Sequence, residues 1–146
     1  MQSHSQVKAI HRIIDANINR VKEGLRVAEE ITRFFLENRR LTEGFKKIRH
    51  NIDTISRCFV SRTHLLKARN SDTDLGREIF ANELRRKNCQ DIFSANIQRT
   101  KESLRVLEEF TQLVNKSLAV DFKSIRYEIY ELEKRAVKKI SALSNT

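Results

Sequence analysis

Apolar residues recur along most of the chain at alternating intervals of four and three positions, which is the spacing of one face of an α-helix. The first stripe predicts a helix that runs to about Asn38, and it consists of Ile14, Ile18, Val21, Leu25, Ala28, Thr32 and Phe35. The next helix, expected to end between Val60 and Lys67, carries a stripe at Leu41, Phe45, Ile48, Ile52, Ile55 and Phe59.

The same pattern returns in the second half of the chain. It predicts one helix from about Cys89 to Val114, with a stripe at Phe93, Ile97, Thr100, Leu104, Leu107 and Val114. It predicts another from about Leu118 to Ala142, with a stripe at Leu118, Phe122, Ile125, Ile129 and Leu132. Between the halves, residues 68–76 break the periodicity and predict a loop, and a modest helix is expected from about Arg77 to Lys87.

The first and third of the long helices repeat one sequence. Residues 15–33 and 94–112 match at twelve of nineteen positions without a gap, and Phe45 to His50 in the next helix corresponds to Phe122 to Tyr127. The repeated unit is therefore a helix hairpin, with copies at 13–60 and 92–136 of a single domain over 1–146. Two such hairpins predict an all-α fold, a four-helix bundle with a short connecting helix.

Composition narrows the class of protein. The 146 residues include no proline and three glycines, and 29 basic against 19 acidic residues give a formal charge of +10. This excess favours anionic partners, either phosphates or nucleic acid. No apolar run reaches the ~18 residues of a membrane span and no leader is evident, so a cytoplasmic protein without a membrane partner is expected. Cys58 and Cys89 lack a C-x-x-C spacing and are expected to be buried free thiols.

A second face of the repeated helix carries candidate chemistry. Asn17, Arg20 and Gly24 lie one turn apart among apolar positions, and Asn96, Arg99 and Ser103 repeat them. Buried polar groups of this kind need a partner. That partner is either a glutamate of the repeat, in a structural network, or an anion in a hollow beside the small residue, with arginine binding two phosphate oxygens. The spacing leaves both open.

Other candidates lie nearby in the pattern. Arg26, Glu29 and Glu30, with their counterparts in the second copy, are expected to form solvated helix pairs. His50 is either an acid or base near neutral pH or an ordinary surface histidine. Asp72 and Asp74, in the loop after Arg69, suit Mg²⁺, with local turn and helix capping as the alternative.

Phosphate-binding glycine motifs are absent. The three glycines, Gly24, Gly44 and Gly76, are far apart, so neither G-x-x-x-x-G-K-[ST] nor G-x-G-x-x-G occurs. An ATP-using protein with this sequence must therefore hold phosphates with side chains and helix N-termini.

Five ordered motifs, which span about Ile10 to Lys134, resemble a small helical family found alone or fused to the N-terminal side of thiamin-phosphate synthase. They are D-A-N-x-x-R-x-x-E-G-L-R-V-x-E-E at 15–30, Arg49-His50, Arg69 with Asp74-Leu-Gly76, A-N-x-x-R-x-x-E-x-L-R-V-L-E-E at 95–109, and R-Y-x-x-Y at 126–130. The resemblance implies a stand-alone hydroxymethylpyrimidine-phosphate kinase of thiamin biosynthesis, unrelated to the ribokinase-like enzyme. Such a kinase transfers the γ-phosphoryl group of ATP onto 4-amino-5-hydroxymethyl-2-methylpyrimidine phosphate.

Roles follow under that reading, with ATP and Mg²⁺ as cofactors and the phosphorylated pyrimidine as substrate. Arg20 and Arg99 are the expected catalytic residues, because phosphoryl transfer needs charge neutralisation. The expected substrate-binding residues are Asn17, Asn96, Arg49, His50, Arg126 and Tyr127. Arg69 would bind ATP, and Asp72 and Asp74 would hold the metal.

Two other functions stay open. A basic helical bundle could bind nucleic acid or another polyanion, although acids interleave with the bases and no recognition helix is evident, which argues against nucleic acid. A non-catalytic helical partner protein would need the Asn/Arg pairs only as ion-pair networks. The semi-apolar second face would also suit a homodimer.

Overall fold

The computed structural model describes residues 3–57, 62–78 and 84–144, and these contain helices and no strand. The elements are α1 (His4–Glu30), the π-helix η1 (Ile31–Phe35), α2 (Arg39–Arg57), α3 (Arg62–Ala68), α4 (Cys89–Thr111) and α5 (Lys116–Ser144). Ser3 and Asn88 cap α1 and α4, since each side chain accepts a hydrogen bond from a backbone N–H of the first turn.

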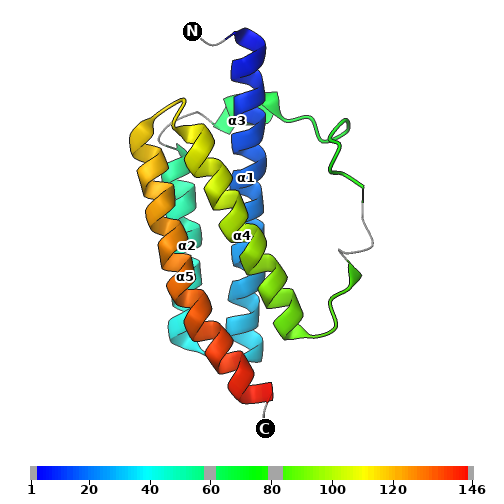
Figure 1. Cartoon of the computed structure of the whole chain (residues 1–146), viewed down its shortest axis with the longest axis vertical. Helices are drawn as coiled ribbons and strands as arrows, with labels where there is room; N and C mark the ends of the chain where they lie inside the picture. The colour runs from blue at the N-terminus through cyan, green and yellow to red at the C-terminus, as the bar shows by residue number, and fades with distance from the viewer. Residues whose placement is uncertain (1–2, 58–61, 79–83, 145–146) are drawn as a thin grey trace.

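The four long helices lie side by side as a bundle (Figure 1). α1 and α2 form one antiparallel hairpin and α4 and α5 form the other, and the largest interface between elements joins α1 to α4. One apolar core runs through all four helices, and Phe45 of α2 meets Phe93 of α4 edge to face at 6.1 Å. The all-α bundle of duplicated hairpins is therefore confirmed.

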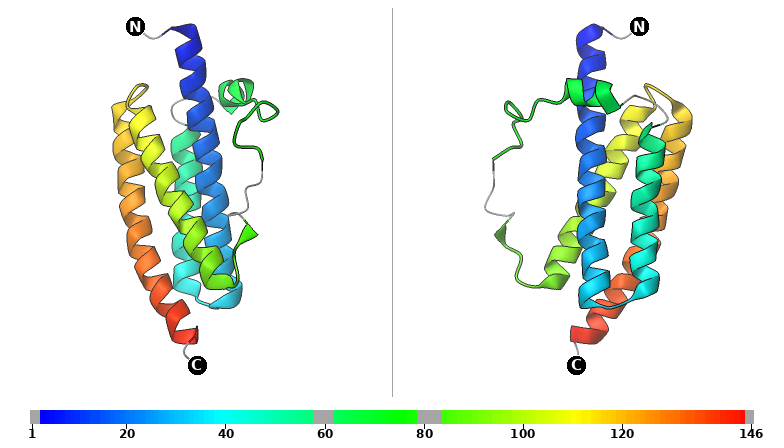
Figure 2. Two further views of the ribbon diagram at one scale, coloured as in Figure 1. Left: turned by 45° about the vertical axis from the view of Figure 1, so that its right-hand side comes forward. Right: turned by 180° about the vertical axis from the view of Figure 1, so that it is seen from behind.

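The connection between the hairpins departs from expectation. α2 and α4 run in the same direction, and the described parts of the connection after α3 lie outside the bundle (Figure 2). The short connecting helix is α3, which buries Leu65 and Ala68 against α1. No α-helix occurs at 77–78 or 84–88, the described part of the helix expected from Arg77 to Lys87. Leu84 there is exposed, so these residues lack the packing that a short helix needs.

The predicted stripes form the core, with two exceptions. Phe35 is 44% exposed because η1 takes extra residues per turn and rotates it away from the stripe that ends at Thr32. Val114 is 42% exposed because α4 ends three residues earlier, at Thr111. Phe59 and Cys58 lie outside the described residues. Cys89 is a free thiol, but it is half-buried at the start of α4, so the expectation of a buried thiol was wrong there.

The end of the second helix, expected between Val60 and Lys67, lies partly outside the described residues. α2 is described as far as Arg57, residues 58–61 are not described, and α3 begins at Arg62. Across the described ranges, no helix combines the length and the apolar character that crossing a bilayer requires.

Candidate functional site

The space beside Gly24, which one of the two interpretations took as an anion-binding hollow, is filled by the partner helix. A Cβ at this position would clash with Thr100 Oγ1 and lie 2.9 Å from the carbonyl oxygen of Asn96, both on α4. Gly24 is thus the residue that lets α1 and α4 approach closely, and this explanation replaces an anion-binding hollow at the glycine.

Arg20 and Arg99 lie next to this crossing with their side chains in solvent. Both are exposed, so the expectation that they are buried was wrong. Within the described ranges, neither arginine has a carboxylate at ion-pair distance. Asn17 orients Arg20 by accepting a hydrogen bond from its Nη1 at 3.3 Å. Asn17 and Asn96 both donate to the carbonyl oxygen four residues earlier in their own helix, at 2.8 Å. The two guanidinium groups are therefore open to an anion from solution.

Each hairpin contains a Glu–Arg ion pair between its two helices, and the two pairs occupy equivalent positions of the repeat. Glu29 accepts hydrogen bonds from Arg49 Nε at 3.0 Å and Nη2 at 3.5 Å, across the α1–α2 hairpin. Glu108 is bound in the same two-pronged way by Arg126, with 3.1 Å between Nη2 and Oε1. Glu29 and Glu108 were expected to be solvated, and that expectation was wrong because the next helix of each hairpin covers them.

Aromatic residues surround the pair in the second copy. Arg126 donates to the Tyr130 hydroxyl at 3.4 Å, and its guanidinium lies 5.2 Å from the Tyr127 ring centre and 5.8 Å from that of Tyr130. The hydrogen bonds to Glu108 raise the pKa of Arg126 above its ordinary value, so this arginine stays charged. Tyr127 itself is exposed beside Tyr130.

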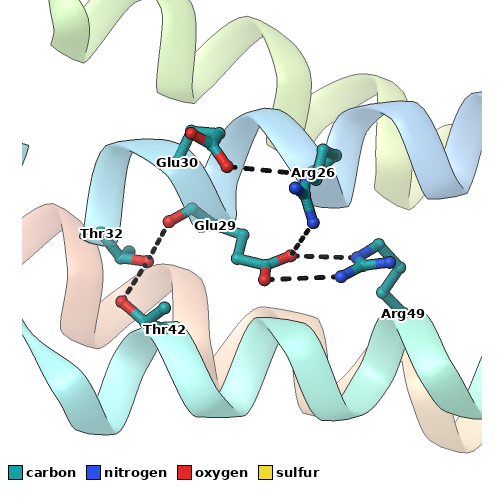
Figure 3. A network of polar contacts seen from close by, with 6 residues as sticks. All are labelled: Arg26, Glu29, Glu30, Thr32, Thr42 and Arg49. Atoms are coloured by element: carbon teal, nitrogen blue, oxygen red, sulfur yellow. Dashed lines mark hydrogen bonds and ion pairs between the residues drawn. The ribbon is translucent and has the colours of Figure 1, made fainter. Parts of the chain in front are cut away.

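A shallow, widely open cleft of about 460 Å³ lies on the α1–α2 hairpin. Its walls are formed by Asn19, Lys22, Glu23, Arg26, Val27 and Arg49. Figure 3 shows Glu29 between Arg26 and Arg49, with Arg26 Nη1 3.8 Å from its Oε2. A guanidinium carries five N–H donors, so both arginines keep donors beyond those that Glu29 uses.

The other walls of this cleft differ in chemistry. Lys22 reaches Asp53 of α2 at 2.6 Å and is about one-third exposed. Glu23 and Asn19 supply oxygen acceptors, and Val27 supplies an apolar surface. The cleft therefore combines donors for phosphate, acceptors for an N–H group and an apolar wall, which together suit a small phosphorylated heterocycle.

Asp15 joins the long connection to α1 just above this cleft. Both of its carboxylate oxygens accept hydrogen bonds from Arg69, from Nε and Nη2, each at 2.8 Å. These hydrogen bonds raise the pKa of Arg69. Asp15 also faces Asn19, whose Nδ2 lies 3.0 Å from the carbonyl oxygen of Asp15 and 3.4 Å from Oδ1. Arg69 is thus anchored to α1 and lies beside the wall of the cleft.

The loop aspartates make local contacts. Asp72 is exposed and lies 3.5 Å from Arg77, and Asp74 Oδ1 accepts the backbone N–H of Gly76 at 2.9 Å. The described residues contain no group of three or more His, Cys, Asp or Glu side chains that could cage a metal ion. A pair of loop carboxylates still fits Mg²⁺ that arrives on nucleotide phosphates, because such an ion needs only one or two protein ligands.

The remaining candidate residues lie on other surfaces. His50 is exposed on a shallow hollow of about 260 Å³ with Glu43, Lys46 and Lys47. A third hollow, of about 340 Å³, lies on the α4–α5 hairpin and includes Arg105, Lys116 and Lys123. The structure therefore places Arg49 alone, of the predicted site residues, in the α1–α2 cleft.

Sequence reasoning missed most of that cleft. Asp15, Asn19, Lys22 and Arg26 follow 4-3-4 spacing on a third face of α1, and this polar stripe was a usable signal. The signal is weak because polar residues also cover the solvent-exposed face of an ordinary amphipathic helix, so spacing alone does not distinguish a ligand-binding face.

Known proteins with similar sequences are named thiamine-phosphate synthase. The relative from Synechocystis sp. is 40% identical over 126 residues, which cover 86% of this chain and 35% of the relative. Those from Rhodopirellula baltica and Prochlorococcus marinus are 33% and 38% identical and cover 97% and 85% of this chain. The chain spans about a third of the length of the curated relatives it matches.

No solved structure matches this sequence. The sequence pattern of the ThiD2 family matches residues 12–135, which include most of α1, the α1–α2 cleft and most of α5. The chain therefore belongs to the ThiD2 family.

Proposed function

We propose that this protein is a phosphotransferase of thiamin biosynthesis that converts 4-amino-5-hydroxymethyl-2-methylpyrimidine phosphate to the diphosphate at the expense of ATP. Membership of the ThiD2 family and relatives named thiamine-phosphate synthase support a place in this pathway. In the reaction, a phosphate oxygen of the pyrimidine substrate bonds to the γ-phosphorus of ATP. The bond from that phosphorus to the β-bridging oxygen breaks, and ADP leaves.

The α1–α2 cleft is the observation that carries the proposal. Its donors Arg26 and Arg49 suit the substrate phosphate, and Glu23 and Asn19 suit the amino group of the ring. Val27 offers an apolar contact to the ring itself. Because Glu29 and Asp53 counter the cations, recognition depends on directed N–H donors more than on a net positive field.

Arg20 and Arg99 are proposed to neutralise the transferring phosphoryl group, because their guanidinium groups are exposed and have no carboxylate partner within the described residues. Arg69 would bind ATP, and Asp72 and Asp74 would hold Mg²⁺ on the nucleotide, whose role is to neutralise phosphate charge. Asn17 contributes by orienting Arg20. Asn96, Arg126, Tyr127 and His50 remain proposals as substrate-binding residues.

Phosphorus NMR of the purified chain with ATP, Mg²⁺ and the pyrimidine phosphate tests the proposal. The expected result is ADP and a new organic diphosphate in equal amounts. Arg20→Ala, Arg99→Ala and Arg26→Ala should each lower kcat/KM about a hundredfold, as the loss of a charge-stabilising donor does in other enzymes. Arg135→Ala, an exposed α5 arginine paired with Glu131, is the control and should match the wild-type rate.

Each possible result separates the parts of the proposal. A folded wild-type chain that makes no diphosphate would show that the proposed reaction is wrong. Full activity in both Arg20→Ala and Arg99→Ala would show that these residues have no catalytic role. Full activity in Arg26→Ala would show that the α1–α2 cleft is not the substrate site. Neither result would refute the proposed reaction.

A further inference from the structure

The amide of Asn19 has one side that is occupied by the protein and one that is not. Its Nδ2 faces Asp15, 3.0 Å from the carbonyl oxygen and 3.4 Å from Oδ1. Its Oδ1 accepts no hydrogen bond from any residue of the described ranges, and the side chain lines the α1–α2 cleft. Because Nδ2 is turned toward Asp15, the oxygen is the atom that Asn19 can offer to a ligand.

Asp15 is itself held in place. It is a buried carboxylate, and Arg69 binds both of its oxygens at 2.8 Å in the fork geometry that fixes a carboxylate most firmly. A carboxylate accepts hydrogen bonds and cannot donate them, so it allows only the orientation of Asn19 in which Nδ2 faces it. The backbone carbonyl oxygen of Asp15, at 3.0 Å, and its carboxylate, at 3.4 Å, both accept from Nδ2, so together they determine which amide atom faces the cleft.

The second copy lacks this arrangement. Ser94 stands where the first copy has Asp15, and Gln98 stands where it has Asn19. Ser94 is exposed, and Gln98 donates instead to Glu102 in its own helix at 3.1 Å. The chain of contacts that orients an amide toward a cleft thus occurs only in the first copy, which is also the copy with the larger cleft.

We infer that Asn19 Oδ1 selects ligands that carry an N–H donor, such as the amino group of an aminopyrimidine phosphate, and that Asp15 is the positioning residue that aims it. The inference deepens the proposed function and rests on it for the identity of the ligand. The inference assigns recognition of the pyrimidine ring to the first copy of the repeat, at the α1–α2 cleft.

Binding affinities measured by calorimetry in the absence of ATP test the inference independently of turnover. The probes are 4-amino-5-hydroxymethyl-2-methylpyrimidine phosphate and its analogue with hydrogen in place of the amino group. The wild-type chain should bind the amino compound about tenfold more tightly, the value of one well-placed hydrogen bond. Asn19→Ala should bring the two affinities together. Asp15→Asn should reduce the preference only in part, because the backbone carbonyl oxygen of residue 15 still accepts from Nδ2. Gln98→Ala and Ser94→Ala, at the equivalent positions, should keep the preference.

Kinetics of the same variants separates positioning from general damage. Asn19→Ala should raise the KM for the pyrimidine phosphate about tenfold and leave kcat within about twofold, because only recognition of the ring is lost. Asp15→Asn should raise this KM by a smaller factor, since the backbone carbonyl oxygen still holds Nδ2. Arg69→Lys, which keeps the charge but not the fork, should move KM in the same direction.

The outcomes distinguish this inference from the proposed reaction. Amino-group preference that persists in folded Asn19→Ala, or a wild-type chain that binds neither probe, overturns the inference. Preference that depends on Asn19 in a chain without kinase activity supports the inference and refutes the proposed reaction. Turnover with no effect of either substitution refutes the inference alone.

Discussion

Arg126 binds both carboxylate oxygens of Glu108 across the α4–α5 hairpin, and the two side chains are only 11% and 8% exposed. Removing one partner of a buried ion pair leaves an uncompensated charge in the protein. Glu108→Gln should therefore lower the free energy of unfolding by about 3–5 kcal/mol, measured by urea denaturation. Glu109→Gln, in an exposed pair with Arg105, should change it by less than about 0.5 kcal/mol. Equal effects in the two variants would show that the buried ion pair contributes no more to the free energy of unfolding than the exposed one.

The raised pKa of Arg126 predicts how this contribution depends on pH. A cation whose pKa is higher in the folded state than in the unfolded state adds stability below the unfolded value, and this stability is lost as pH rises through the folded value. Both values lie far above neutrality, since hydrogen bonds to Glu108 raise the pKa. The stability difference between wild type and Glu108→Gln should therefore be constant between about pH 7 and pH 9. A clear decrease over that range would contradict a fully charged pair.

Gly24 and Gly44 both lie inside helices, but the atoms that surround them differ. Gly24→Ala places a methyl group against Thr100 and the α4 backbone, so the helices must separate, at a cost of about 1–3 kcal/mol. At Gly44 the new methyl would lie 2.9 Å from the tip of Leu132, a side chain that can move, and the alanine gains helix propensity. Thermal unfolding should show a drop of several degrees for Gly24→Ala and a smaller change for Gly44→Ala. The reverse order would refute the close α1–α4 approach.

Lys22 and Lys101 are equivalent lysines of the two copies, and only Lys22 lines the α1–α2 cleft. Lys101 instead binds Glu133 at 2.8 Å and lies over the Tyr130 ring. Calorimetry with inorganic diphosphate should therefore show about tenfold weaker binding for Lys22→Ala and unchanged binding for Lys101→Ala. Equal losses, with both variants folded, would place the anion outside this cleft.

Most of the bundle could be predicted from the sequence because periodicity records which face of each helix is buried. The stripe from Ile14 to Thr32 and that from Leu118 to Leu132 are both in the core. The π-helix could not be predicted, since a change of register after Glu30 leaves no signal in the apolar spacing. The expected helix from Arg77 to Lys87 was wrong in its described part for a different reason: residues 77–78 and 84 are exposed, so they have no surface to pack on.

The site was less predictable because its geometry depends on pairs between distant residues. Arg49 was named from the sequence, but Glu29, its partner twenty positions earlier, read as a surface residue. Asp15 and Arg69 are 54 positions apart, and nothing local in the sequence connects them. The sequence left open whether Gly24 borders an anion-binding hollow, and only the packing of Thr100 against it shows that it is a helix contact.

Amide chemical shifts of the ¹⁵N-labelled chain, recorded as the pyrimidine phosphate is added, test most directly whether the α1–α2 cleft is the ligand site. The predicted result is a saturable change centred on the first-copy residues Asn19, Lys22, Glu23, Arg26 and Val27. Saturable changes centred instead on Arg105, Lys116 and Lys123 of the α4–α5 hairpin, or no saturable change anywhere, would contradict it.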